Sequence, residues 1–186
     1  QSPELRRYRR AYDAEVRSYE AQASRQELVA RVAASDIVFA GDYHPLRQAQ
    51  RTLMRILRDT VLLRHKIVLA MELVCSHDQA LLEDYMGGNL PEEDFLSGID
   101  YERQWGFPWE NYRPLLAFAA EHSIPVFGIN SRQDEGPQAL RLRDEHAAGV
   151  IADLSSRNPG TLVFVVIGDL HVASRHLPAC VARRLR

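Results

Sequence analysis

Short apolar runs alternate with amphipathic segments along most of the chain. Four runs lack any polar alternation, at residues 37–40, 67–71, 125–129 and 162–167. Segments with a helical spacing of apolar residues separate them, the most regular at 46–63. Apolar strands that alternate with helices are typical of a parallel sheet covered on both faces. The pattern therefore predicts an α/β fold, a single domain with a mainly parallel central sheet and helices on both faces.

Two regions lie outside this alternation. Residues 1–34 predict an N-terminal helical extension, with one helix over about the first 20 residues and a second from Arg25 to Ala33, capped by Ser24. The aromatic insertion at 87–111 is expected to form short helices and loops over one end of the sheet. Three more helices are expected, from a cap at Ser76 to about Tyr85, over Asn111–Glu121 and over Leu140–Leu154.

Length, composition and charge narrow the class of protein. With 186 residues, 46% hydrophobic and 26% charged, the chain fits one globular domain spanning 1–186. Its net charge of -2 argues against nucleic acid or an anionic membrane as the main partner. Cys75 and Cys180 are too few for a disulfide scaffold and lack zinc-site spacing. No apolar run approaches the roughly 20 residues of a membrane helix.

Polar side chains follow each of the four apolar runs within four residues. They are Asp42 and His44, Glu72, Asn130, and Asp169 and His171. Because parallel strands end at one edge of a sheet, where ligands bind, we expect these side chains to share one site. We expect His44, Glu72 and His171 within hydrogen-bonding or one-water distance of each other. The two aspartates, each two residues before a histidine, would orient the imidazoles or act as further ligands. Singly, Glu72 could cap a helix and each histidine could be structural.

The residue types at this edge suit chemistry on an activated water. His44 or His171 would act as general base, Glu72 would orient the water or share the proton, and Asn130 would donate to a developing oxyanion. A metal-assisted variant would use Asp42, His44, Glu72 and His171 as ligands of a divalent metal. The chain contains no Gly-x-Ser-x-Gly motif, which argues against a serine triad of the α/β-hydrolase kind.

Aromatic and arginine residues form two further groups. Five aromatic residues fall within twelve positions, namely Tyr101, Trp105, Phe107, Trp109 and Tyr112. They could line an apolar ligand pocket or form a satellite core beneath the insertion. Four arginines form one helical stripe just after His44, namely Arg47, Arg51, Arg55 and Arg58. Such a stripe is usually a solvated or ion-paired face, and it could also meet the carboxylates of a ligand.

From about Asp36 to Pro178 the sequence resembles the ChaN-like haem-binding family, related to the Tiki and erythromycin-esterase group. The matching positions are Gly41-Asp42-Tyr43-His44, Met71-Glu72, Gln79, Trp105, Tyr112, Pro125 to Asn130, Gly168-Asp169-Leu170-His171 and Leu177-Pro178. Asp42 replaces a usual Glu, Pro45 stands where an acid is common, and Leu170 stands where a small residue precedes the histidine. The shorter Asp42 would retract its carboxylate by one methylene.

The resemblance implies haem as the cofactor, bound by a tyrosine oxygen from Tyr43, Tyr101 or Tyr112. Trp105 and the rest of the insertion would cover the macrocycle, and arginines could pair with its propionates. Haem binding, in iron or haem acquisition or handling, is thus the leading prediction. Hydrolysis is the alternative, since relatives use the same histidine and glutamate positions for it. The chain could also form a homodimer.

The resemblance also bears on the compartment. Resemblance to the lipoprotein members of the family predicts a location in the cell envelope. If no leader was removed, the expected location is the cytoplasm. Membrane attachment is expected only through a segment outside this chain.

Overall fold

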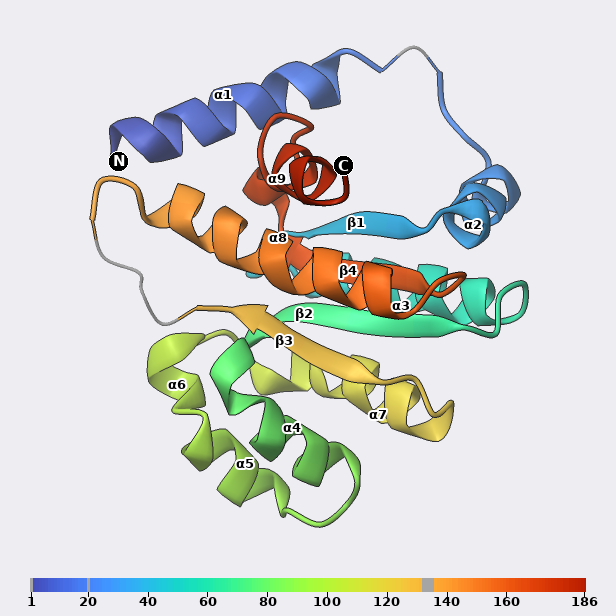
Figure 1. Ribbon diagram of the computed structural model, residues 1–186, viewed down its shortest axis with the longest axis vertical. Coiled ribbons are helices and arrows are strands. Elements are labelled where there is room, and N and C mark those ends of the chain that lie inside the picture. Colours follow the sequence, from blue (N-terminus) through green and yellow to red (C-terminus); the bar gives the residue numbers. More distant parts are fainter. Residues whose placement is uncertain (1, 20, 132–135) are drawn as a thin grey trace.

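The computed structural model of the protein describes residues 2–19, 21–131 and 136–186 (Figure 1). Within these residues, helices cover a sheet of four strands. The helices are α1 (Pro3–Arg17), α2 (Arg25–Ala34), α3 (Arg47–Val61), α4 (Gln79–Met86), α5 (Glu92–Gly98), α6 (Tyr101–Gln104), α7 (Arg113–Glu121), α8 (Ala139–Arg157) and α9 (Leu177–Arg184). The strands are β1 (Ile37–Asp42), β2 (Ile67–Cys75), β3 (Val126–Asn130) and β4 (Leu162–Gly168). No helix of the described ranges is long and apolar enough to span a membrane.

All strand pairs of this sheet are parallel, and the strand order is β1-β4-β2-β3. Each connection between successive strands contains at least one helix, because parallel pairing requires a crossover. The predicted single α/β domain with a parallel sheet is therefore confirmed. The two central strands, β4 and β2, end beside the candidate functional residues.

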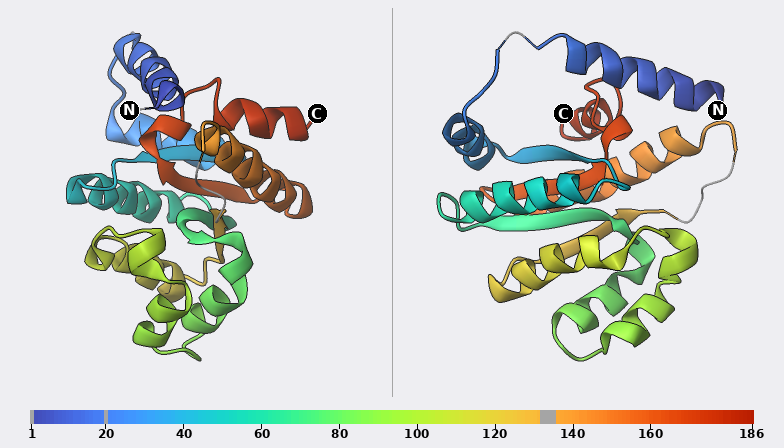
Figure 2. Two further views of the ribbon diagram at one scale, coloured as in Figure 1. Left: turned by 90° about the vertical axis from the view of Figure 1, so that its left-hand side faces the viewer. Right: turned by 180° about the vertical axis from the view of Figure 1, so that it is seen from behind.

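Both faces of the sheet are buried, which explains the absence of polar alternation in the strands. Successive side chains of a strand point to opposite faces. Leu69 and Met71 of β2 and Phe164 of β4 pack in a core that includes α3 and α7. Val68 and Ala70 of β2 pack in a second core with α8 and α9. Figures 1 and 2 show α8 and α3 on opposite faces of the sheet.

Strand β2 is longer than the sequence pattern predicts. It was expected to end at Met71, just before Glu72, but it continues to Cys75. Up to Met71 it pairs with both β4 and β3, and beyond a register irregularity it pairs with β3 alone. Gly128 permits this close approach, because a Cβ there would lie only 2.7 Å from the carbonyl oxygen of Val74. Glu72 therefore lies where β4 separates from β2, inside the strand.

One predicted helix start is confirmed and another is wrong. Ser24 caps α2 through a capping box with Glu27, in which each side chain accepts a hydrogen bond from the other residue's backbone N–H. Ser76 does not cap the next helix, because it opens a 3₁₀ turn and α4 begins only at Gln79. Gln79 makes two hydrogen bonds to backbone groups of β3. These bonds occupy backbone groups of β3 that have no neighbouring strand, because β3 lies at the edge of the sheet.

The N-terminal extension packs on the domain through α1. Glu4 is buried, and its carboxylate accepts hydrogen bonds from the backbone N–H groups of Leu140 and Arg141 in the first turn of α8. A carboxylate at this end of a helix also interacts favourably with the helix dipole. Figure 1 shows α1 lying alongside α8 and α9 at the top of the molecule. The extension thus reaches the sheet edge that carries the polar residues.

The insertion is part of the main core. It contains α5, α6 and a 3₁₀ turn at Trp109–Asn111, as the expected short helices and loops. Phe95, Ile99 and Tyr101 are buried in the same cluster as α3 and β2. The satellite core considered for the aromatic residues is therefore continuous with the core on this face of the sheet.

Candidate functional site

Two histidines face one glutamate at the edge where β1 and β4 end. His44 follows β1, Glu72 lies in β2, and His171 lies in the 3₁₀ turn after β4. Nε2 of His44 is 3.8 Å from Oε2 of Glu72, and Nε2 of His171 is 3.8 Å from Oε1. These distances are too long for direct hydrogen bonds and short enough for both groups to contact one shared atom. The structure thus brings together the three side chains that the strand pattern places at one edge.

Asp42 holds the first histidine. It is 1% exposed, and its Oδ2 accepts hydrogen bonds from Nδ1 of His44 at 2.8 Å and from the Tyr112 hydroxyl at 2.9 Å. Its Oδ1 accepts from Nε2 of Gln50 at 2.5 Å. A buried carboxylate requires donors, so Nδ1 of His44 carries the proton. Nε2, the other ring nitrogen of His44, is left facing Glu72.

An acid on α8, rather than the predicted Asp169, holds the second histidine. Nδ1 of His171 donates to Oδ1 of Asp144 at 2.6 Å, and the Tyr8 hydroxyl of α1 donates to Oδ2 at 2.6 Å. Asp169 is partly exposed at the start of the 3₁₀ turn. Residues two apart in a 3₁₀ turn point in different directions, so Asp169 and His171 diverge. The orienting role expected of Asp169 at His171 belongs to Asp144.

Asp144, Gln50 and Tyr8 are site residues that the strand-end pattern does not select. Asp144 shares the buried stripe of α8 with Ala147, and Gln50 shares that of α3 with Leu53. A polar residue on an apolar stripe needs a buried partner, so this spacing was an available signal for both. Tyr8 offers no comparable signal, because its partner Asp144 is 136 residues away.

The environment of His171 favours its charged form. Burial alone lowers the pKa of His171, but the hydrogen bond to Asp144 and the charges of Glu72 and Asp144 outweigh it, so this pKa is raised above the usual value. The ring of the neighbouring His176 stacks on that of Tyr8, with the ring centroids 3.7 Å apart. Burial lowers the pKa of His176. His171 therefore holds its proton more tightly than a free imidazole does, and in its protonated form Nε2 is a hydrogen-bond donor beside Glu72.

Gly168 forms the floor between the two histidines. Its backbone N–H donates to Oε2 of Glu72 at 2.7 Å and fixes the carboxylate. A Cβ at this position would lie 3.1 Å from Nε2 of His44, 3.4 Å from Oε2 of Glu72 and 3.5 Å from Cδ2 of His171. The three side chains thus converge above a residue that has no side chain.

The insertion supplies one wall of the site, whereas β3 supplies little. The ring centroid of Trp105 is 4.5 Å from that of His44, and the Phe107 centroid is 4.9 Å away. Asn130 lies at the end of β3, where its Oδ1 accepts from the backbone N–H of Ser131. Within the described residues no hydrogen bond joins Asn130 to the two histidines or the glutamate. Its predicted oxyanion role stays a prediction without a supporting contact.

The three tyrosines predicted as haem ligands differ in access. Tyr101 and Tyr112 are 6% and 0% exposed, and their hydroxyls donate to protein oxygens. Burial and nearby carboxylates raise the pKa of both phenols, which disfavours the tyrosinate form that binds haem iron. Tyr43 is 51% exposed and precedes Leu46, which is 52% exposed. The chain therefore fits a macrocycle at Tyr43 better than at the two buried tyrosines.

The predicted metal ligands are largely engaged by the protein. Asp42 uses both oxygens as acceptors of protein hydrogen bonds, and each histidine has only Nε2 free of an aspartate. Glu72 accepts from a backbone N–H. Across the described ranges, three ligand atoms lie within 4.8 Å of each other at Cys75, His77 and Asp78 instead. A divalent metal at the predicted four residues stays a prediction.

Known proteins share the sequence profile and the fold of this chain. A profile of the family described as haem-binding uptake, Tiki superfamily, ChaN matches residues 28–137. The structure described as cofacial haem binding to ChaN of Campylobacter jejuni aligns with a TM-score of 0.70 and 10% identity, over 89% of this chain and 82% of that one. A search of curated proteins finds no significant match.

Two effector proteins also have similar structures. The type III effector HopBA1 aligns with a TM-score of 0.60 and 16% identity, over 79% of this chain and 72% of that one. RRSP, a MARTX toxin effector domain from Vibrio vulnificus CMCP6, aligns with a TM-score of 0.55 and 12% identity, over 82% of this chain and 31% of that one. At these identities the three structures show a shared fold alone.

Proposed function

This chain belongs to the ChaN family of haem-binding uptake proteins in the Tiki superfamily, and we propose that it carries a hydrolytic site built on Glu72. One observation carries the proposal: the carboxylate of Glu72 lies between two histidines, each held by its own buried aspartate. Such an array of buried ionisable groups is costly to assemble, and proton transfer is the use that best accounts for it.

The two histidines would take different roles in hydrolysis. Nε2 of His44, when the ring is neutral, would accept a proton from water while Glu72 orients that water. The resulting hydroxide would attack an acyl or phosphoryl centre. His171, whose raised pKa favours its protonated form, would stabilise the negative charge that develops and give its proton to the leaving atom. His44, the more exposed of the two, would meet the substrate.

A substrate panel with matched variants tests this proposal. The purified protein is assayed against 4-nitrophenyl esters, an anilide and a phosphodiester. Glu72→Gln should lower kcat by about a hundred-fold or more, because it removes the acceptor that orients water. Glu93→Gln, an exposed glutamate of α5, should leave kcat unchanged. Equal rates for wild type and Glu72→Gln, or no turnover of any substrate by the folded protein, would remove the proposal.

Haem binding at Tyr43 is the second candidate function. The specific observation in its favour is the exposed phenol of Tyr43 beside the exposed Leu46, in a chain of a haem-binding family. Tyr43 would ligate the iron, and the apolar ring system would lie on the adjacent surface. This second candidate function includes haem carriage for iron acquisition. It also includes a homodimer and membrane attachment through a segment outside this chain.

An absorption titration with haemin separates the three tyrosines. If Tyr43 is the ligand, Tyr43→Phe should abolish the tyrosinate charge-transfer band while leaving circular dichroism unchanged. Tyr101→Phe and Tyr112→Phe serve as matched controls and should keep the band. A band that survives in all three variants would exclude these three tyrosines as ligands of the iron.

A further inference from the structure

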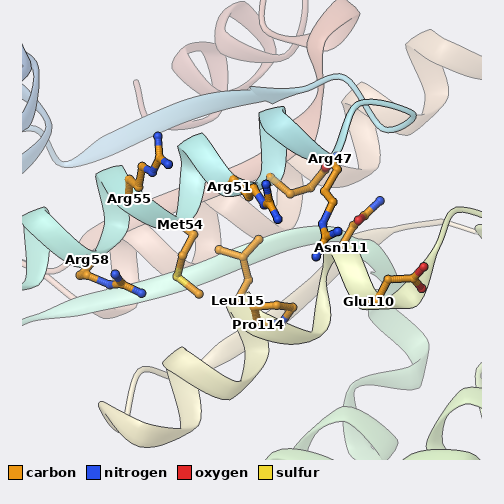
Figure 3. A pocket seen from close by; sticks show the side chains of 10 residues that line it. Arg47, Arg51, Met54, Arg55, Arg58, Glu110, Asn111, Pro114 and Leu115 are labelled. Atoms are coloured by element: carbon orange, nitrogen blue, oxygen red, sulfur yellow. The ribbon is translucent and has the colours of Figure 1, made fainter.

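A cavity lies between α3 and the start of α7. It encloses about 250 Å³, and Figure 3 shows the side chains around it. One face of α3 forms the first wall, through Arg47, Gln50, Arg51, Met54, Arg55 and Arg58. The other wall comes from Glu110, Asn111, Pro114 and Leu115. We call this cavity the arginine groove.

The arginine groove carries an uncompensated positive charge. The side chains of its four arginines make no ion pair or hydrogen bond to another residue that the structure describes. By contrast, Asp59 near the other end of α3 is paired with Arg25 of α2. Glu110 is the single acid among the lining residues. Like charges four residues apart on a helix repel each other. A bound anion would relieve this repulsion.

Gln50 gives a second, independent indication of a ligand. It is 2% exposed, and its Nε2 donates to Oδ1 of Asp42. Its Oε1 is buried without a hydrogen-bond partner among the described residues. A buried acceptor without a donor destabilises a fold, and Gln50 lines the arginine groove. A ligand hydroxyl would satisfy it, provided that the side chains around this buried atom move to admit the donor.

The chemistry of the lining residues defines one ligand class. Guanidinium groups bind phosphate through paired hydrogen bonds, and Met54 and Leu115 can contact a short carbon chain. The volume is below the roughly 300–1,000 Å³ of pockets for drug-sized ligands, so it does not suit a whole haem macrocycle. We propose that the arginine groove binds a small phosphate ester that carries a free hydroxyl group.

The proposal is independent of hydrolysis, although the two sites touch. Gln50 contacts the ligand through one amide atom and Asp42 through the other, and Asp42 orients His44. An occupied arginine groove therefore lies one side chain away from the histidine pair. A phosphorylated polyol in solution and the headgroup of a phospholipid share this chemistry, so the test includes both.

Calorimetry with glycerol 3-phosphate tests the arginine groove. The wild type should bind it, and Arg51→Gln/Arg55→Gln should weaken binding at least about tenfold, because charged hydrogen bonds are lost. The control Arg10→Gln/Arg157→Gln removes the same charge from exposed arginines of α1 and α8 and should bind as the wild type does. Propyl phosphate, which lacks the hydroxyls, should bind several-fold more weakly.

Three outcomes would overturn the proposal. Equal weakening in both double variants would show non-specific attraction by net charge. No binding of glycerol 3-phosphate by the folded wild type would show that the cavity takes no phosphate ester. Sedimentation with vesicles containing phosphatidic acid, without binding of the free ester, would assign the surface to a membrane lipid. Binding of the free ester with no vesicle association supports the proposal.

Discussion

At the scale of single residues, the protonation of His171 depends on a partner from another element. Asp144 accepts a hydrogen bond from Nδ1 of His171, and Glu72 lies beside Nε2. The Tyr8 hydroxyl donates a hydrogen bond to the other carboxylate oxygen of Asp144. The hydrogen bond to Asp144 and the charges of Glu72 and Asp144 outweigh burial and raise the pKa of His171. Protonation and folding are therefore coupled, since the folded state binds this proton more tightly than the unfolded chain.

This coupling predicts the effect of Asp144→Asn. A raised pKa gives a stabilisation that is complete below the unfolded value of about 6.5 and is lost as pH rises through the folded value. The variant should lose it, so the difference in unfolding free energy from wild type should be largest near pH 5 to 6 and shrink at alkaline pH. NMR titration should show a lower pKa for His171. Asp153→Asn, exposed on α8, is the control; an unchanged His171 titration in Asp144→Asn would contradict the argument.

At the scale of elements, α1 links two parts of the site. Its Glu4 accepts hydrogen bonds from two backbone N–H groups in the first turn of α8, and its Tyr8 donates a hydrogen bond to Asp144. Both contacts lie on the buried face of α1, one helical turn apart. The extension is therefore a support of the histidine site as well as a cover for α8.

We predict that Glu4→Ala lowers the free energy of unfolding by about 1–2 kcal/mol, the usual cost of removing a side-chain cap. Two backbone N–H groups of α8 would lose their acceptor. Chemical denaturation measures the change, and Glu121→Ala, exposed at the end of α7, is the matched control. A loss no larger than that of the control would show that α1 does not stabilise α8 in this way.

At the scale of the whole molecule, the insertion and the sheet share one hydrophobic core, so we expect them to unfold together. Phe95 of the insertion is 0% exposed and stacks on Tyr85 of α4 at 4.5 Å, within the core that also holds β2 and β4. Both tryptophans of the chain, Trp105 and Trp109, lie in the insertion, so their fluorescence reports on it. Circular dichroism reports mainly on the helices of the rest of the molecule.

Phe95→Ala should therefore destabilise the whole domain by about 3–5 kcal/mol, through the cavity it leaves. The fluorescence and circular dichroism transitions should still coincide, as in two-state unfolding. Leu62→Ala, at a leucine that is 75% exposed, should change stability by no more than about 0.5 kcal/mol. Separate transitions in the wild type would show that the insertion folds independently.

The sequence by itself determined the fold class and the edge at which the site lies. Continuous apolar runs such as 162–167 require a sheet buried on both faces, and parallel strands end at one edge. The sequence could therefore predict the site residues His44, Glu72 and His171, since each lies near the point where two strands cease to pair. The end of β2 was not, because a bulge beside Gly128 extends its pairing with β3.

Only the tertiary structure decided which residues support the site. Asp144 replaces Asp169 at His171, and Tyr8 contributes from the other end of the chain. The arginines of α3 are among the residues that line a cavity because α7 lies against that helix. Periodicity fixes which face of a helix is buried, but it does not specify the neighbour on that face. Partners more than a hundred residues apart are set by packing between elements, and a single sequence carries no local signal for that packing.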